Sequence, residues 1–139
     1  MTSPLDLYPI SENAPDQAVS ASGMPLADLT LDAVISERIG AEDIRISAGV
    51  LRLQASIARD AGRDRLALNL ERAADLVSVP QDLILDTYEM LRPGRIPEAQ
   101  LLKERAELLR REYGAHTIAA LIDEAVAVYE RRNLFRRRY

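Results

Sequence analysis

Apolar residues recur every three or four positions through most of this chain after residue 30. The stretch from Leu51 to Pro93 shows the pattern most clearly, as three short amphipathic segments with breaks at Gly62 and Pro80. Such a recurrence places apolar side chains on one face of an α-helix. Runs of β-branched residues with alternating polarity, which would predict strands, do not occur in the sequence. The pattern therefore predicts an all-α fold.

Composition and length agree with packed helices in one domain. Hydrophobic residues make up 47 % of the 139 residues but aromatic residues only 4 %, so a core would consist of Leu, Ile, Val and Ala. There is no cysteine, which excludes disulfides and thiolate metal sites. No apolar run approaches the roughly 20 residues that a membrane span needs, and the N-terminus lacks the features of a secretory signal. We therefore expect a cytoplasmic protein.

Capping residues predict where the helices begin and end. Thr30 is a good N-cap for a helix expected to reach Ile39, with Gly40 just beyond its end. Ser47 and Gly62 bound the next helix in the same way. Further helices are expected over residues 63–77, 81–91 and about 97–114, and from residue 116 or 117 onward. In the helix over 63–77, the stacked apolar stripe consists of Leu66, Leu70, Ala73 and Val77. The prediction is a compact bundle of about five to six helices spanning residues 30–139.

Residues 1–29 form a separate, proline-rich N-terminal arm. Four of the seven prolines lie here, and their spacing favours extended or polyproline-like backbone. Apolar residues, including Tyr8 and Leu26, are interspersed among them. Such a segment is either a solvated tail or an arm pinned on a partner by its apolar side chains. Under the second alternative, Tyr8 and Leu26 are candidate interface residues.

Charge is unevenly distributed along the chain. The net charge is -4, so there is no global attraction to nucleic acid, yet residues 1–46 alone carry a net charge of -6. The C-terminus is rich in arginine, with Arg131, Arg132 and three more within residues 136–138. This cluster fits a nucleic-acid or lipid patch, a helix C-terminus whose dipole favours cations, or a surface that docks on an acidic protein. Because Phe135 is interleaved with these arginines, we favour protein docking through Arg131, Arg132 and Phe135.

Residues for catalysis are scarce. His116 is the only histidine, so the chain cannot build a histidine-based metal site, and a first-turn position in a helix explains it. The carboxylates lie among arginines at helical spacing, which indicates solvated helix surface. No phosphate-binding glycine loop is present. We therefore expect neither a catalytic residue nor a metal or cofactor site on this chain.

Residues 30–93 carry a family resemblance. The block LRLQASIA-DAGRDRLA-N-ERAADL, followed by VP-D-IL--Y--LRP, resembles the small (γ) subunit of the adenosylcobalamin-dependent diol and glycerol dehydratases. The later run LLKERAELLRREYGAHTIAALIDEAVAVYERR and the Tyr8-Pro9 pair are similar to the same family. The resemblance covers roughly residues 7–133.

The resemblance implies a partner complex. It implies two copies each of a large, a medium and a small subunit, with substrate and the catalytic metal in the barrel of the large one. Adenosylcobalamin would lie between the large and medium subunits, where radical chemistry removes water from propane-1,2-diol or glycerol to give an aldehyde. This chain would be a non-catalytic structural subunit, with neither nucleic acid nor membrane as a partner.

Two departures from the family pattern affect these expectations. Some members carry an additional N-terminal segment linked to packaging in a microcompartment. This sequence starts almost at the arm, so the resemblance gives no basis for expecting such targeting here. The terminal NLFRRRY also differs from the family's ends. The alternative is a stand-alone helical adaptor or regulator that binds nucleic acid through its arginine-rich C-terminus.

Overall fold

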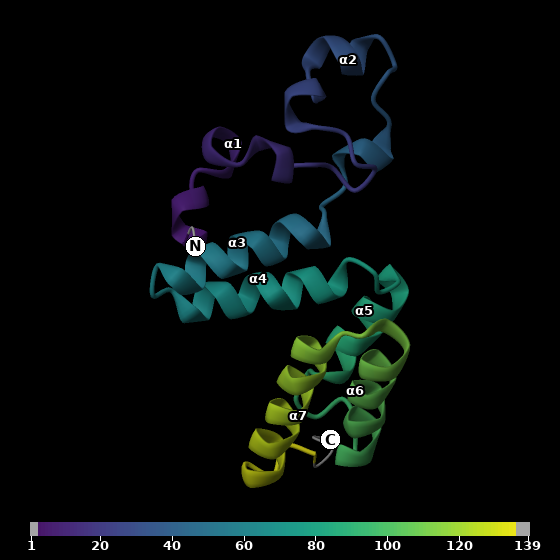
Figure 1. The fold of residues 1–139 in the computed structure, drawn as a ribbon. Helices are drawn as coiled ribbons and strands as arrows, with labels where there is room; N and C mark the ends of the chain where they lie inside the picture. Colours follow the sequence, from purple (N-terminus) through teal and green to yellow (C-terminus); the bar gives the residue numbers. More distant parts are fainter. Residues whose placement is uncertain (1–2, 136–139) are drawn as a thin grey trace. The chain divides into compact units, whose positions relative to one another are not determined.

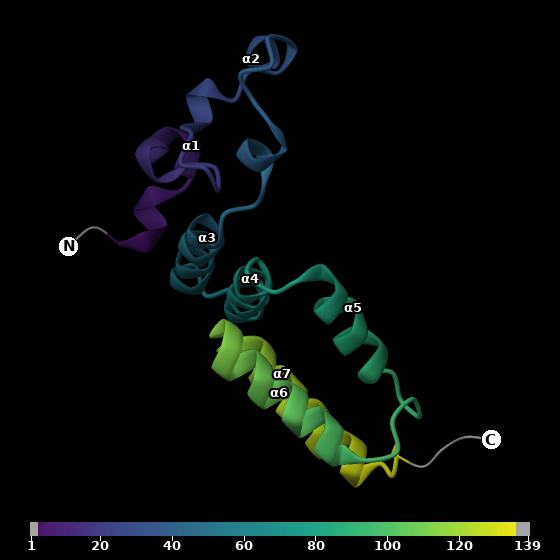
Figure 2. The same cartoon turned by 90° about the vertical axis from the view of Figure 1, so that its right-hand side faces the viewer.

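The computed structural model describes residues 3–135. Within them, regular structure is helical apart from one isolated bridge between Val19 and Pro25. The all-α prediction is therefore confirmed. Figures 1 and 2 show the α-helices in two views: α1 (Ile10–Asn13), α2 (Leu31–Ile35), α3 (Ala48–Asp60), α4 (Asp64–Leu76), α5 (Gln81–Met90), α6 (Ala99–Tyr113) and α7 (His116–Arg131).

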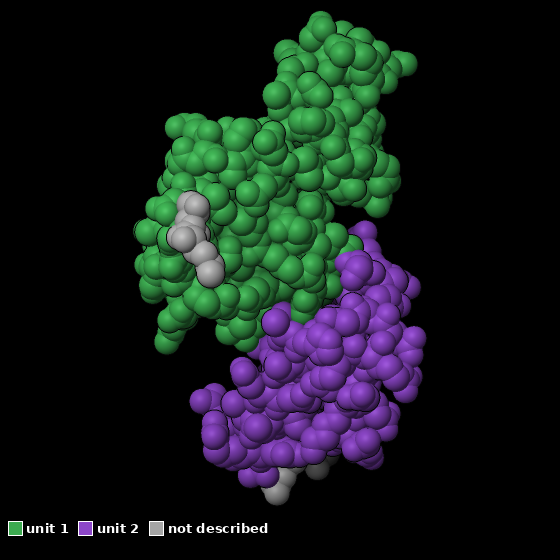
Figure 3. Space-filling model, in the orientation of Figure 1, with its two compact units in different colours: residues 1–77 green, residues 78–139 purple. Residues whose placement is uncertain are grey.

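The chain divides into two compact units (Figure 3). Unit 1 comprises Met1–Val77 and contains the arm and α1 to α4. Unit 2 comprises Ser78–Tyr139 and contains α5 to α7. The two units are defined by contacts within the chain. The boundary predicted near residue 29 is a different kind of division, because it separates the arm from the helical domain by amino-acid composition.

Unit 1 is built on the antiparallel pair of α3 and α4 (Figure 1). Ser47 caps α3 by accepting a hydrogen bond from the Val50 N–H, as predicted. Gly62 has a left-handed φ of 72° and turns the chain between the two helices. Ala55, Ala58 and Ala67 are buried between the helices. Small side chains at a crossing allow two helix backbones to approach closely, so this core is narrow.

The face of α4 that packs against α3 coincides only in part with the stripe predicted from the sequence, because Leu70 of that stripe packs against the buried alanines and its other members do not. Ala67 and Ala74 are buried, whereas Leu66 and Val77 of the predicted stripe remain 46 % and 45 % exposed. Ala73 is also exposed. Periodicity identified an apolar face of α4 correctly but could not tell which face packs inside the chain.

The first predicted helix ends earlier than expected. Thr30 caps α2, but the helix ends at Ile35 rather than Ile39. Glu37 takes the left-handed conformation with φ 57°, while Gly40 has φ -102°. The Arg38 N–H donates to the Ala33 carbonyl at 2.9 Å, which closes a Schellman turn. The predicted helix end at Gly40 was wrong because Glu37, three residues earlier, adopts the left-handed conformation that ends the helix.

The arm is less extended than predicted. It folds into short helical turns: η1 (Pro4–Leu7), α1, η2 (Pro15–Gln17) and η3 (Leu26–Asp28). Pro4 and Pro15 occupy the first turn of their segments, where the fixed φ of proline suits a helix and its missing N–H costs nothing. Prolines here begin turns rather than prevent them. A fourth turn, η4 (Ala41–Ile44), follows α2.

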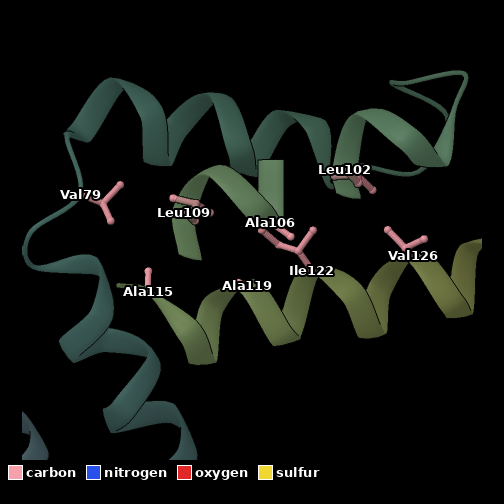
Figure 4. Packing of buried hydrophobic residues seen from close by; sticks show 8 residues of the cluster. All are labelled: Val79, Leu102, Ala106, Leu109, Ala115, Ala119, Ile122 and Val126. Atoms are coloured by element: carbon pink, nitrogen blue, oxygen red, sulfur yellow. The ribbon is translucent and has the colours of Figure 1, made fainter. Parts of the chain in front are cut away.

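Unit 2 holds the larger core (Figure 4). Leu102 and Leu109 of α6 meet Ile122 of α7, and all three are almost completely buried. Gly114 ends α6 in the left-handed conformation with φ 61°, as predicted, and the chain reverses into α7. His116 is the first residue of α7, which confirms its predicted first-turn position.

Polar groups tie α5 to the other helices of unit 2. The Arg105 guanidinium of α6 donates to Thr87 Oγ1 at 2.7 Å and pairs with Asp86 at 2.5 Å. The Tyr129 hydroxyl of α7 donates to the Leu91 carbonyl at 2.5 Å. Helix α5 is therefore held by directed bonds as well as by apolar packing.

Candidate subunit interface

The beginning of the arm is bound to the C-terminal end of α3. The Asp60 carboxylate accepts a hydrogen bond from the Leu5 N–H at 3.0 Å and another from the Ser3 hydroxyl. These hydrogen bonds, the Ser3 one foremost, lower the pKa of Asp60 below its ordinary value. The first described residues of the arm are therefore bound to a defined position on α3 of the same chain.

Helix α3 accommodates the arm because it has two apolar faces. One face carries Ala55 and packs against α4. The other carries Ile57 and Ala61, which line a groove together with arm residues. We call this groove of about 410 Å³ the arm groove; its walls include Leu5, Tyr8, Ile57, Ala61, Arg63 and Leu66. Tyr8, a predicted interface residue, is 66 % exposed there.

A second groove of about 370 Å³ lies between the arm, η4 and the start of α3. Leu26, the other interface residue predicted in the arm, lines it together with Ile44 and Ile46. All three side chains are exposed. Asp43 at this groove accepts hydrogen bonds from the Ser22 hydroxyl and the Gly40 N–H, and both lower its pKa.

Most large apolar side chains that are exposed in the described residues belong to unit 1. Monomeric proteins rarely leave extensive apolar surface open to water, so such surface is typical of protein–protein contact. Periodicity placed some of these residues in core stripes and so missed their exposure. The exposed side chains of unit 1 are Leu5, Tyr8, Leu26, Leu31, Val34, Ile35, Ile44, Ile46, Leu66, Leu68 and Val77.

The predicted C-terminal interface residues have different environments. Arg131 ends α7 and Arg132 follows it, and both are exposed. Phe135 is half-buried and packs edge-on against Tyr129, with ring centroids 5.8 Å apart. Residues 136–138, the rest of the arginine cluster, lie outside the described residues. The structure thus brings Tyr8 close to the arm groove and Phe135 into unit 2, in two separate units.

Residues 3–135 contain no group of three or more His, Cys, Asp or Glu side chains placed to hold a metal ion. His116 is exposed at the start of α7. Among the same residues, no helix is both long and apolar enough to cross a membrane. The features that stand out in the described part of the chain are therefore apolar grooves and exposed helix faces.

Residues 4–136 match the family described as "Dehydratase small subunit". The chain belongs to this family. It is 47 % identical over 128 residues to the "Propanediol dehydratase small subunit" of Salmonella typhimurium, a match covering 91 % of this chain and 73 % of that protein. The protein of the same name from Citrobacter freundii is 46 % identical over 128 residues, which cover 91 % of this chain and 74 % of that protein. The family resemblance predicted from the sequence is confirmed.

Membership in the dehydratase small-subunit family bears on the grooves of unit 1. A small subunit has other subunits as partners, and its contact surfaces are exposed when the chain stands alone. The arm groove includes Arg63 and Leu66, neither of which the sequence singled out as an interface residue. The sequence offered one signal for Leu66, the apolar stripe to which it belongs, and none for Arg63.

Proposed function

We propose that this chain is the small, non-catalytic structural subunit of an adenosylcobalamin-dependent diol or glycerol dehydratase. Such a complex is a hydro-lyase that converts propane-1,2-diol or glycerol to the corresponding aldehyde and water. The observation that carries the proposal is the 47 % identity to a propanediol dehydratase small subunit across 91 % of the chain. The exposed apolar side chains of unit 1 support it, because they provide surface for assembly.

The partners proposed for this chain are a large barrel subunit and a medium subunit, with two copies of each chain in the complex. The arm, residues 1–29, and the helical domain, residues 30–139, would both contribute docking surface. Tyr8 and Leu26 in the arm and Arg131, Arg132 and Phe135 at the C-terminus remain the predicted contact residues. The proposed location is the cytoplasm.

The residues of this chain do not fit a cobalamin or metal site. Its single histidine is exposed at a helix start, and the described residues hold no metal-binding cluster of acids and histidines. We therefore assign no step of the reaction to this chain, and the proposal leaves the cofactor with the large and medium subunits. That this chain binds no cofactor stays a prediction.

The alternative, a stand-alone adaptor that binds nucleic acid through the C-terminal arginines, has less support. Arg131 and Arg132 are exposed, which suits either function. The family match, however, extends over residues 4–136 and is to a subunit of an enzyme. The comparisons therefore favour the structural subunit.

Co-expression tests the proposal. A tagged copy of this chain is produced together with the large and medium dehydratase chains of the same organism, and the purified material is assayed for diol dehydration with added adenosylcobalamin. We expect one complex of the three chains with activity, and no activity from this chain alone. Elution of this chain by itself, while the other two form an active enzyme, would contradict the proposal.

A further inference from the structure

The arm groove combines an apolar lining with one cation. Arg63 is the only charged residue among the described residues that line it. The turn at Gly62 sets its position, because the Arg63 N–H donates to the Ala58 carbonyl at 2.8 Å. The backbone of Arg63 is therefore fixed at the edge of an apolar surface.

Within residues 3–135, Arg63 has no carboxylate partner, in contrast to Arg52 and Arg59 of α3. On α3, Arg52 pairs with Asp75 at 3.6 Å and Arg59 pairs with Glu71 at 2.8 Å. The acid nearest to it on α3, Asp60, accepts the hydrogen bonds of the arm instead.

We propose that the arm groove binds a segment of a neighbouring dehydratase subunit that carries a large apolar side chain beside a carboxylate. The apolar side chain enters between Tyr8, Ile57 and Leu66, and the carboxylate pairs with Arg63. A guanidinium suits this task because it binds a carboxylate through two parallel hydrogen bonds. The inference rests on the proposed function for the identity of the partner and adds which surface is used and what it recognises.

The arm is part of this binding site. Leu5 and Tyr8 form one wall of the groove, and the contact with Asp60 holds that wall in place. Release of the arm would therefore remove the site while leaving the α3–α4 pair intact. The arm acts by shaping the surface on its own chain as well as by offering Tyr8 for contact.

Charge reversal tests the carboxylate. Arg63→Glu is compared with Arg65→Glu, which makes the same change two residues further along at an exposed position outside the groove. Association with the purified complex of large and medium subunits is measured for each variant, with circular dichroism to establish that it is folded. We expect Arg63→Glu to weaken association about tenfold or more, and Arg65→Glu by less than about threefold. Equal affinities for Arg63→Glu and wild type would overturn the proposal.

Releasing the arm tests the other wall. Asp60→Ala removes the carboxylate that binds Ser3 and Leu5. We expect it to weaken association to an extent similar to Arg63→Glu, and the double variant to lose little more, because both changes act on one site. If the double variant instead lost affinity by the product of the two single losses, the arm and Arg63 would contact the partner independently, which would contradict the proposal.

Cross-linking identifies the occupant. The chain has no cysteine, so Leu66→Cys carries a single thiol that can be labelled with a photo-reactive group. In the assembled complex, we expect a cross-link to a large or medium subunit at an apolar residue within a few positions of an Asp or Glu. A cross-link to a second copy of this chain, or to a segment without an acid, would overturn the proposal.

These outcomes are distinct from failure of the proposed function. If wild-type chain does not associate with the large and medium subunits at all, the proposed function fails. If wild type associates while the groove variants and Arg65→Glu all behave like it, only the docking site is wrong.

Discussion

The carboxylate of Asp60, the last residue of α3, accepts a hydrogen bond from the backbone N–H of Leu5, which lies 55 positions earlier in the chain. This contact, together with that from the Ser3 hydroxyl, binds the beginning of the arm to α3. It turns a proline-rich segment into one wall of a groove. The position of the start of the arm therefore depends on the Asp60 carboxylate as well as on the apolar residues of the arm.

Acid should release the arm. The hydrogen bonds from Ser3 and Leu5 lower the pKa of Asp60 from its ordinary value of 3.8. Because the ionised carboxylate accepts these hydrogen bonds, it stabilises the bound arm at any pH above the ordinary pKa. This stabilisation is lost as the pH falls through the lowered pKa of the folded protein. We expect the Leu5 amide to be protected from hydrogen exchange at neutral pH and to lose protection below about pH 4.

The comparison variant for this experiment is Asp60→Asn, with exchange rates corrected for their intrinsic pH dependence. It should show weaker protection of Leu5 at neutral pH and no acid transition. An identical pH profile in both proteins would mean that Asp60 does not hold the arm.

Arg105 should stabilise unit 2. Its side chain is only 15 % exposed, and it donates to the buried Thr87 hydroxyl as well as pairing with Asp86. Arg105→Met should lower the free energy of unfolding by about 1–3 kcal/mol, because hydrogen bonds of a partly buried charged group are lost. Lys103→Met, two residues away, breaks a half-exposed pair with Glu130 and should change stability by less than about 0.5 kcal/mol. Urea denaturation of the two full-length variants measures both values.

The α3–α4 crossing should not tolerate a larger side chain. Ala67 has no exposed surface and lies between the two helices. Ala67→Leu should cost about 1–3 kcal/mol of stability because the helices must separate. Ala73→Leu on the same helix adds the same atoms at an exposed position and should change stability by less than about 0.5 kcal/mol. Thermal unfolding followed by circular dichroism would show whether the two variants differ; equal melting temperatures would contradict the close crossing.

Glycine to alanine changes should have opposite signs at two sites. Gly114 has φ 61°, so Gly114→Ala should destabilise the protein by about 1 kcal/mol. Gly49 lies in α3 with ordinary helical backbone, and an added Cβ would meet only Ser47 Oγ at 3.6 Å. Gly49→Ala should therefore stabilise the protein by about 0.5–1 kcal/mol. Chemical denaturation that gave the same sign for both would count against the left-handed turn after α6.

Local signals in the sequence predicted much of the secondary structure. The caps at Thr30 and Ser47 and the stops at Gly62 and Gly114 are confirmed, because a cap depends on hydrogen bonds within a few residues. The same rule was wrong at Gly40. There the left-handed residue is Glu37, so α2 closes before the glycine is reached.

The candidate interface was only partly predictable. Tyr8 and Leu26 were recognised as apolar residues in a polar arm, and both are exposed at grooves. Leu66 was assigned to a core stripe because periodicity measures how apolar a face is and not what covers it. Arg63 carried no signal, since the groove that it borders exists only when the arm lies beside α3.

The sequence by itself determined that this protein is all-α, where its longer helices stop, and to which family it belongs, because these follow from local hydrogen bonding and from residue identities along the chain. Only the tertiary structure decided which apolar face of α4 packs against α3, and that the arm sits on Asp60. The physical reason is that these choices depend on contacts between residues far apart in sequence. Small alanines let one pair of helix faces close together, and the apolar faces left over remain available to another subunit.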